Sequence, residues 1–175
     1  MRLVCDIFFW NNSPYLLLSD YYSKFPLMRK LNVWSDTTIA HLKAIFEDHG
    51  IPNNLTTSND TQFTSTLFSE FYSTYGFMHM ATSPSCLQAN GFNERTIQTV
   101  KNLLQKCKES GADRYLAMLC PNSTPIDHNI TSPAEFLDSR AYQTNFPSIS
   151  KPGLPLSAHG KVNTKLQARQ DQQKS

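Results

Sequence analysis

A long amphipathic segment between Ser83 and Lys108 constrains the fold of this chain more than any other stretch. Apolar residues recur in it every three or four positions, which places them along one side of an α-helix. These residues are Ile97, Val100, Leu104 and Cys107. The opposite side carries one acid followed by amides and amines, all within roughly 40° of one line along the helix. They are Glu94, Gln98, Lys101, Gln105 and Lys108. The pattern predicts a long helix with one packed side, and its polar side alone is typical of a solvated helix face.

Five short strands and several further helices are predicted around this helix. The apolar runs that indicate strands cover residues 1–10, 15–19, 25–31, 53–57 and 77–82. Helical patterns cover residues 36–49, 64–75, 114–119 and 132–137, and the third of these is expected to end before Pro121. Because the first three strands follow one another closely, they predict an antiparallel meander with a turn over residues 11–14. This order of elements is typical of an α/β fold, in which a mixed sheet carries helices on both faces.

Charge is distributed unevenly along the 175 residues, a length that suits one domain. Residues 151–175 hold five basic residues and one acid, which leaves 11 basic (16 less 5) and 13 acidic (14 less 1) residues in 1–150. A folded part this close to neutral binds nucleic acid only through a local basic patch. The four cysteines and five histidines lack zinc-site spacing, so we expect reduced thiols inside a cell. No apolar run approaches the ~18 residues of a membrane-spanning helix, and no membrane partner is expected.

Asp6 stands in the middle of the first apolar strand. A buried aspartate costs several kcal/mol unless it is paired, protonated or bound to a metal. The predicted topology could bring Asp6, the loop at 58–62 and Glu94 together at one end of the sheet. Converging carboxylates bind Mg²⁺ or Mn²⁺, and paired ions of this kind support phosphoryl transfer. The sequence therefore indicates a candidate metal-dependent site at these positions.

Short phrases along the chain, each weak alone, occur in a distinctive order and spacing. They are Cys5-Asp6-Ile7-Phe8, Ser19-Asp20-Tyr21-Tyr22-Ser23, His49-Gly50-Ile51-Pro52, Gln62-Phe63, Gln88-Ala89-Asn90-Gly91 with Glu94-Arg95 and Gln98-Thr99-Val100-Lys101, and Ser132-Pro133-Ala134-Glu135. Together they resemble the integrase catalytic core of long-terminal-repeat retroelements, in the ribonuclease-H-like superfamily. The resemblance implies a ribonuclease-H-like core with a five-stranded mixed sheet over residues 1–142. Residues 143–175 are Pro-rich, polar and mildly basic, and we expect a disordered tail there.

The resemblance also identifies a catalytic triad, in which one member is missing. The family uses Asp, Asp and Glu; Asp6 matches the first position and Glu94 the last. The family's spacing counted back from Glu94, and its loop aligned on residues 62–63, both place Ser58 at the second aspartate. The nearest acid, Asp60, stands at a glycine position of the family. Asp6 and Glu94 are thus the expected ligands of Mg²⁺ or Mn²⁺, with Asp60 as a further candidate. Because a hydroxyl is a weak neutral ligand, we expect weak or no catalysis.

DNA is the partner that the resemblance implies. The family joins the DNA ends of the retroelement to target DNA by metal-dependent polynucleotidyl transfer, and this predicts a nuclear location. Arg95, Gln98, Lys101 and Lys108 are the candidate DNA contacts. A homodimer is a further expected partner, whereas a small-molecule substrate is not expected. Two alternatives stay open: a non-catalytic nucleic-acid-binding or dimerisation module, and a decayed retroelement fragment without function.

Several single residues allow two interpretations. Asp20, at the end of the second strand, is either an outer-shell group of the site or, as we expect, the cap of a turn. Lys101 is either a DNA contact or a solvated lysine. For Ser58 we predict a loop hydroxyl rather than a nucleophile, and for His79 a packed residue rather than a ligand. Trp10 and Trp34 are expected to pack at the ends of strands and loops.

Overall fold

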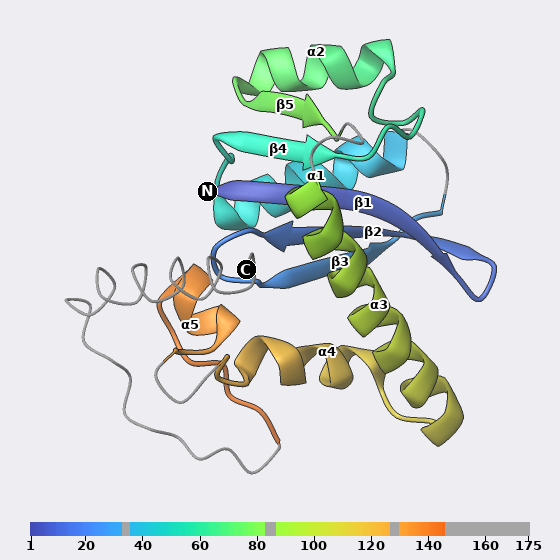
Figure 1. The fold of residues 1–175 in the computed structure, drawn as a ribbon, viewed down its shortest axis with the longest axis vertical. Coiled ribbons are helices and arrows are strands. Elements are labelled where there is room, and N and C mark those ends of the chain that lie inside the picture. The colour runs from blue at the N-terminus through green and yellow to red at the C-terminus, as the bar shows by residue number, and fades with distance from the viewer. Residues whose placement is uncertain (33–35, 83–86, 127–129, 146–175) are drawn as a thin grey trace. The chain divides into compact units, whose positions relative to one another are not determined.

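Five strands form a single mixed sheet in the order β3-β2-β1-β4-β5 (Figure 1). The structure, a computed structural model, describes residues 1–32, 36–82, 87–126 and 130–145. The strands are β1 (Arg2–Trp10), β2 (Ser13–Asp20), β3 (Pro26–Lys30), β4 (Asn54–Thr57) and β5 (Met78–Ala81). The first three pair in antiparallel fashion, β4 pairs with β1 in parallel, and β5 pairs with β4 in parallel. The predicted meander and the predicted five-stranded mixed sheet are both confirmed.

The turn between β1 and β2 is tighter than the sequence suggested. Asn11 and Asn12 both have positive φ, at 48° and 57°, and they are the only residues between the paired Trp10 and Ser13. Two left-handed residues make a turn whose twist matches that of the flanking strands, and asparagine tolerates this conformation. Since these two residues complete the reversal, β2 begins at Ser13 rather than at the predicted position 15.

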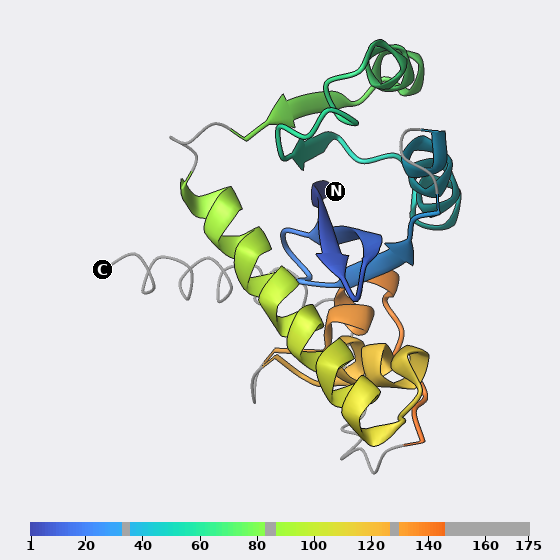
Figure 2. The same ribbon diagram turned by 90° about the vertical axis from the view of Figure 1, so that its right-hand side faces the viewer.

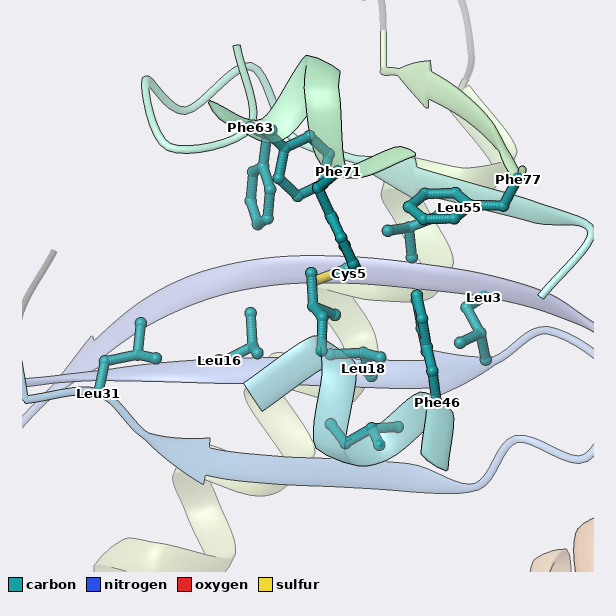
Figure 3. Close-up of a cluster of buried hydrophobic side chains, with 13 residues drawn as sticks. Leu3, Cys5, Leu16, Leu18, Leu31, Phe46, Leu55, Phe63, Phe71 and Phe77 are labelled. Carbon is teal, nitrogen blue, oxygen red and sulfur yellow. The ribbon is translucent and has the colours of Figure 1, made fainter. Parts of the chain in front are cut away.

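Helices cover both faces of this sheet (Figure 2). On one face, α1 (Asp36–His49) and α2 (Thr66–Tyr75) contribute Phe46, Phe68 and Phe71 to a buried core. Figure 3 shows how this core meets the side chains of the central strands. The strand residues in it are Leu3, Cys5, Leu16, Leu18 and Leu55. This packing explains why the aromatic residues of α2 recur at helical spacing.

The other face is covered by α3 (Leu87–Ser110), which contacts β1 and β2. Val100, Leu104 and Cys107 are buried, as the apolar spacing predicts. Side chains alternate along a strand, so the residues of β1 that do not point into the first core face α3. Asp6 is one of them, because it lies between Cys5 and Ile7, which pack on the first core. The fold therefore carries the mid-strand aspartate to the side of the sheet covered by α3.

The helix α4 (Arg114–Ser123) runs past Pro121, so the prediction that it would end before this proline was wrong. A proline removes one backbone N–H donor, and the loss is costly only where the helix interior depends on it. Here the final turn is closed after the proline, because the Thr124 N–H donates to the Cys120 carbonyl at 3.0 Å.

The chain divides into two compact units, Met1–Ala112 and Asp113–Ser175. The first holds the sheet with α1, α2 and α3, and the second holds α4 and α5 (Pro133–Asp138). As predicted, Ser132 caps α5, and its hydroxyl accepts the Glu135 N–H. The domain boundary between 142 and 143 stays a prediction, and Trp34 and the tail beyond 145 lie outside the described residues. In the described part of the chain, no helix has both the length and the apolarity to cross a membrane.

Candidate functional site

Asp6 is half-buried on β1 and receives hydrogen bonds from three directions. One carboxylate oxygen accepts the Ile7 backbone N–H at 2.8 Å, and the other accepts the side-chain amide of Asn93 at 3.1 Å. The Ser58 side chain also hydrogen-bonds to this carboxyl group. Burial raises the pKa of Asp6, and the nearby charge of Asp60 raises this pKa further; the three hydrogen bonds oppose the shift without cancelling it. The protein itself therefore satisfies the carboxyl group that the sequence marks as the first metal ligand.

Ser58 lies directly after β4, which is the parallel neighbour of β1. Its hydroxyl donates to the Asp60 carboxylate at 3.2 Å, while its carbonyl accepts the Thr57 hydroxyl at 2.9 Å. A serine carries one hydroxyl proton, so at any moment Ser58 donates to either Asp60 or Asp6, and both carboxyl groups lie within its reach. The loop thus brings Asp6, Ser58 and Asp60 together.

The loop that carries Ser58 is fixed at both ends. The Asn59 side chain donates to the Thr82 carbonyl at 3.1 Å, which ties the loop to the end of β5. Further along, the buried Gln62 accepts the Thr38 hydroxyl from α1 at 2.6 Å. Because both ends are anchored, the position of Asp60 is set by the fold rather than by a free loop.

Asn93 and Glu94 are neighbours on α3 with opposite surroundings. Asn93 is 6% exposed and reaches Asp6 with its amide nitrogen, while its amide oxygen is buried without a partner among the described residues. Glu94 is exposed, and its side chain hydrogen-bonds to none of the residues that the structure describes. The structure therefore connects Asn93, and not Glu94, to the Asp6 carboxyl group.

These residues do not form a site for two divalent cations. Within the described ranges, no group of three or more His, Cys, Asp and Glu side chains is placed to hold a metal ion. Paired cations need several carboxylates to offset their mutual repulsion. Here Asp6 and Asp60 are the carboxylates close enough to influence each other, with a serine hydroxyl and an asparagine amide around them.

The four candidate DNA contacts all lie on α3, and each has a partner within the protein. The Arg95 Nε donates to the Gly91 carbonyl at 3.0 Å, and Gln98 donates to Asn102 at 2.8 Å. The Lys101 ammonium stands 5.6 Å from the centre of the Phe8 ring, and the Lys108 ammonium donates to Asn11 at 3.1 Å. Arg95, Gln98 and Lys108 are exposed, while Lys101 is half-buried. Three of the four side chains therefore still reach the surface.

Two of the ambiguous residues have structural roles. The Asp20 carboxylate accepts the Ser23 backbone N–H at 2.8 Å, which is the expected turn cap. His79 packs beside the Phe68 ring and hydrogen-bonds to the Thr57 hydroxyl at 2.8 Å, so it is the packed histidine that was predicted. Burial lowers its pKa, which keeps the imidazole neutral near pH 7.

Asn93 is the residue of this site that the sequence interpretation missed. A signal was available, because position 93 extends the buried spacing of 97, 100 and 104 by one helical turn towards the N-terminus. A polar residue in a buried stripe needs a polar partner, and a mid-strand aspartate on the adjacent strand is one. The family motif marks Glu94 and gives no sign of a role for the residue before it.

Comparisons with known proteins place the fold among integrase cores. No protein-family model matches the sequence. An uncharacterized protein of Caenorhabditis elegans is 32% identical over 105 residues, which cover 58% of this chain and 8% of that protein. The Gag-Pro-Pol polyprotein of Sheep pulmonary adenomatosis virus is 31% identical over 136 residues, or 77% of this chain and 7% of the polyprotein. The chain thus spans less than a tenth of the length of these two relatives.

Two solved structures have the same fold. The catalytic core domain of BIV integrase superposes with a TM-score of 0.69 at 15% identity, and covers 79% of this chain and 93% of its own. The simian T-cell lymphotropic virus intasome, solved in complex with a PP2A regulatory subunit, contains a chain that matches with a TM-score of 0.67 at 18% identity. That match covers 86% of this chain and 58% of the viral chain. The expected ribonuclease-H-like fold is confirmed.

Proposed function

We propose that this chain is the catalytic core of a retroelement integrase whose active site is impaired by Ser58. The relatives are a retroviral polyprotein and an uncharacterized protein, and the fold is that of integrase cores. The activity that follows from this relationship is the joining of retroelement DNA ends to target DNA in the nucleus. DNA is the substrate in this proposal, and a second copy of the chain is a further partner.

One observation carries the impairment: a serine stands beside Asp6 where the family places a carboxylate. The family chemistry depends on Mg²⁺ or Mn²⁺, with Asp6 and Glu94 as the inherited ligands and Asp60 as a further candidate. The carboxylates that lie together do not suit a cation pair, so we derive no reaction step through one. Loss of one member of a catalytic group that acts as a unit typically lowers the rate by about 10³-fold or more.

A non-catalytic role in binding nucleic acid is the second candidate. It is supported by the hydrogen bonds that satisfy Asp6 within the protein, since a buried carboxyl group with protein donors needs no cation. In this alternative the integrase fold is kept as a DNA-binding module, and restoring a carboxylate at position 58 creates no activity.

Strand transfer and disintegration assays on model DNA with Mn²⁺ separate these functions. We expect the wild-type chain to be inactive or nearly so, and Ser58→Asp to raise the rate by roughly 10³-fold. The matched control is Ser110→Asp, which adds the same charge at the exposed end of α3. Equal rates for wild type and Ser58→Asp, whether high or absent, contradict the proposal that Ser58 is the cause of impairment.

A further inference from the structure

A group of aromatic and basic side chains gathers where the β2–β3 loop meets α3. We call it the Lys24 cluster, and its members are Arg2, Tyr21, Tyr22, Lys24, Phe92 and Arg95. Arg2 belongs to β1, Tyr21 to Lys24 belong to the loop, and Phe92 and Arg95 belong to α3. Phe92 directly precedes Asn93, so the cluster borders the site around Asp6.

Hydrogen bonds within the loop hold Lys24 in an uncommon backbone conformation. Lys24 has a φ of 62°, in the left-handed region that L-residues rarely occupy. The Lys24 N–H donates to the Asp20 carbonyl at 2.9 Å. The backbone N–H of the preceding residue, Ser23, donates to the Asp20 carboxylate at 2.8 Å. The Ser23 hydroxyl in turn accepts the Phe25 N–H at 3.2 Å. The loop is thus preformed, and the direction of the lysine is fixed before any ligand arrives.

The ammonium group of Lys24 lies between two aromatic rings. Its Nζ is 4.5 Å from the centre of the Tyr21 ring and 4.3 Å from the centre of the Phe92 ring, and the two rings meet edge to face. It donates one hydrogen bond, to the Tyr21 carbonyl at 2.7 Å. An ammonium has three N–H donors, so two have no hydrogen-bond acceptor among the described residues.

The cluster carries more positive than negative charge. The Arg2 guanidinium stands 5.0 Å from the Tyr21 ring, and the Arg95 charge acts directly on Lys24. Asp20 is the acid that attracts Lys24, but it is 6% exposed and caps the turn. Burial, together with Arg95, lowers the pKa of Lys24 to about 8 despite the attraction of Asp20. Two cations held close together, with the buried Asp20 as the acid that acts on Lys24, favour the approach of an external anion.

An aromatic side chain beside Tyr21 remains open to solvent. Tyr22 is 47% exposed and meets Tyr21 edge to face at 6.1 Å between ring centres. Tyr22 is linked to Lys24 through the Tyr21 ring. An exposed ring in a cluster that also holds cations suits a base that stacks while its phosphate is bound, and neither a free phosphate nor an acidic peptide supplies such a base.

We propose that the Lys24 cluster is a nucleic-acid contact surface, in which Lys24 and Arg95 bind a backbone phosphate and Tyr22 stacks on an unpaired base. This inference rests on the proposed function and deepens it, because it identifies where an unpaired stretch of the DNA substrate binds. It adds Lys24 and Tyr22, neither of which was a candidate DNA contact in the sequence, to the exposed Arg95.

Fluorescence anisotropy with a labelled single-stranded oligonucleotide tests the surface in the full chain. We expect Lys24→Met to weaken binding by roughly tenfold or more, the usual cost of a lost charge-assisted bond, and to reduce the salt dependence by about one phosphate contact. The matched control is Lys106→Met, an exposed lysine of α3 outside the cluster, for which a change of about twofold is expected. Tyr22→Ala should weaken single-strand binding by roughly fivefold or more and leave binding of a duplex of the same sequence nearly unchanged.

The proposal is overturned if Lys24→Met binds no more weakly than Lys106→Met, or if Tyr22→Ala binds the single strand as well as wild type does. Lys24→Arg keeps the charge and is expected to retain affinity, which separates loss of a contact from loss of the fold. The titrations are run in EDTA, so they depend neither on catalysis nor on Ser58. The anisotropy titration and the strand-transfer assay therefore test separate claims. A negative result in one does not change the interpretation of the other.

Discussion

Asp6 keeps both of its carboxylate oxygens hydrogen-bonded within the protein, to the Ile7 N–H and to the Asn93 amide. A carboxylate that serves as a metal ligand must turn at least one lone pair towards the cation. The Asn93 amide therefore takes up one of the lone pairs that a cation would otherwise contact. Burial also raises the pKa of Asp6, and so disfavours the charged form that binds metal.

Lys24 predicts a measurable dependence of stability on pH. Its pKa in the folded chain is about 8, below the ordinary value of 10.5, so between these values the folded chain binds fewer protons than the unfolded chain. The contribution of Lys24 to the free energy of unfolding therefore rises as the pH increases above 8. Below pH 8 this contribution is constant and at its lowest. We expect the free energy of unfolding of Lys24→Met, relative to wild type, to fall as pH rises from 8 to 10.

Urea denaturation at several pH values measures this difference, and Lys106→Met is the control because that lysine is exposed. A difference, Lys24→Met minus wild type, that stays constant or rises from pH 8 to 10 would show that Lys24 is not desolvated.

At the scale of single residues, sequence reasoning identified the strand aspartate and the serine beside it, because both lie in recognisable phrases. It could not identify Lys24 or Tyr22 as members of one cluster. Their neighbours Phe92 and Arg95 lie about 70 positions further along the chain, and only the packing of α3 against the β2–β3 loop brings them together. Contacts of this range depend on tertiary structure and leave no local pattern.

Among the elements, two glycines predict opposite effects of the same substitution. Gly76 ends α2 with a φ of 70°, where an alanine is strained although no atom lies within 4 Å of its Cβ. Gly91 lies inside α3, where an alanine Cβ meets only the end of Arg95 at 3.7 Å. We expect Gly76→Ala to lower the free energy of unfolding by about 1 kcal/mol and Gly91→Ala to raise it by up to about 1 kcal/mol.

Thermal unfolding of the two variants, each compared with wild type, checks the pair. Shifts of the same sign would contradict the assigned backbone conformations. A loss well above about 1 kcal/mol for Gly76→Ala would indicate packing that the structure does not contain.

The elements themselves were predictable because their signals are local. Apolar runs bounded by turn residues gave five strands, and helical spacing gave the buried side of α3. Two boundaries were not predictable in the same way. The start of β2 depends on two consecutive left-handed asparagines, and the end of α4 depends on a backbone bond formed beyond Pro121.

At the scale of the whole molecule, the fold brings together residues from three separate parts of the first unit. Asp6 comes from the middle of β1, Ser58 and Asp60 from the loop after β4, and Asn93 from the start of α3. This unit contains the five-stranded sheet, helices on both of its faces and the anchored loop. We therefore propose that any impairment arises from one side chain, Ser58, rather than from the fold.

Isothermal titration calorimetry of Mn²⁺ binding to the full chain tests that claim most directly. A carboxylate added at position 58 supplies both the missing oxygen ligand and the missing charge, so Ser58→Asp should bind Mn²⁺ roughly tenfold or more tightly than wild type. Ser58→Asn, which matches the aspartate in shape but not in charge, should give little or no gain. Wild type binding Mn²⁺ as tightly as Ser58→Asp, or Ser58→Asn matching the aspartate, would contradict the account.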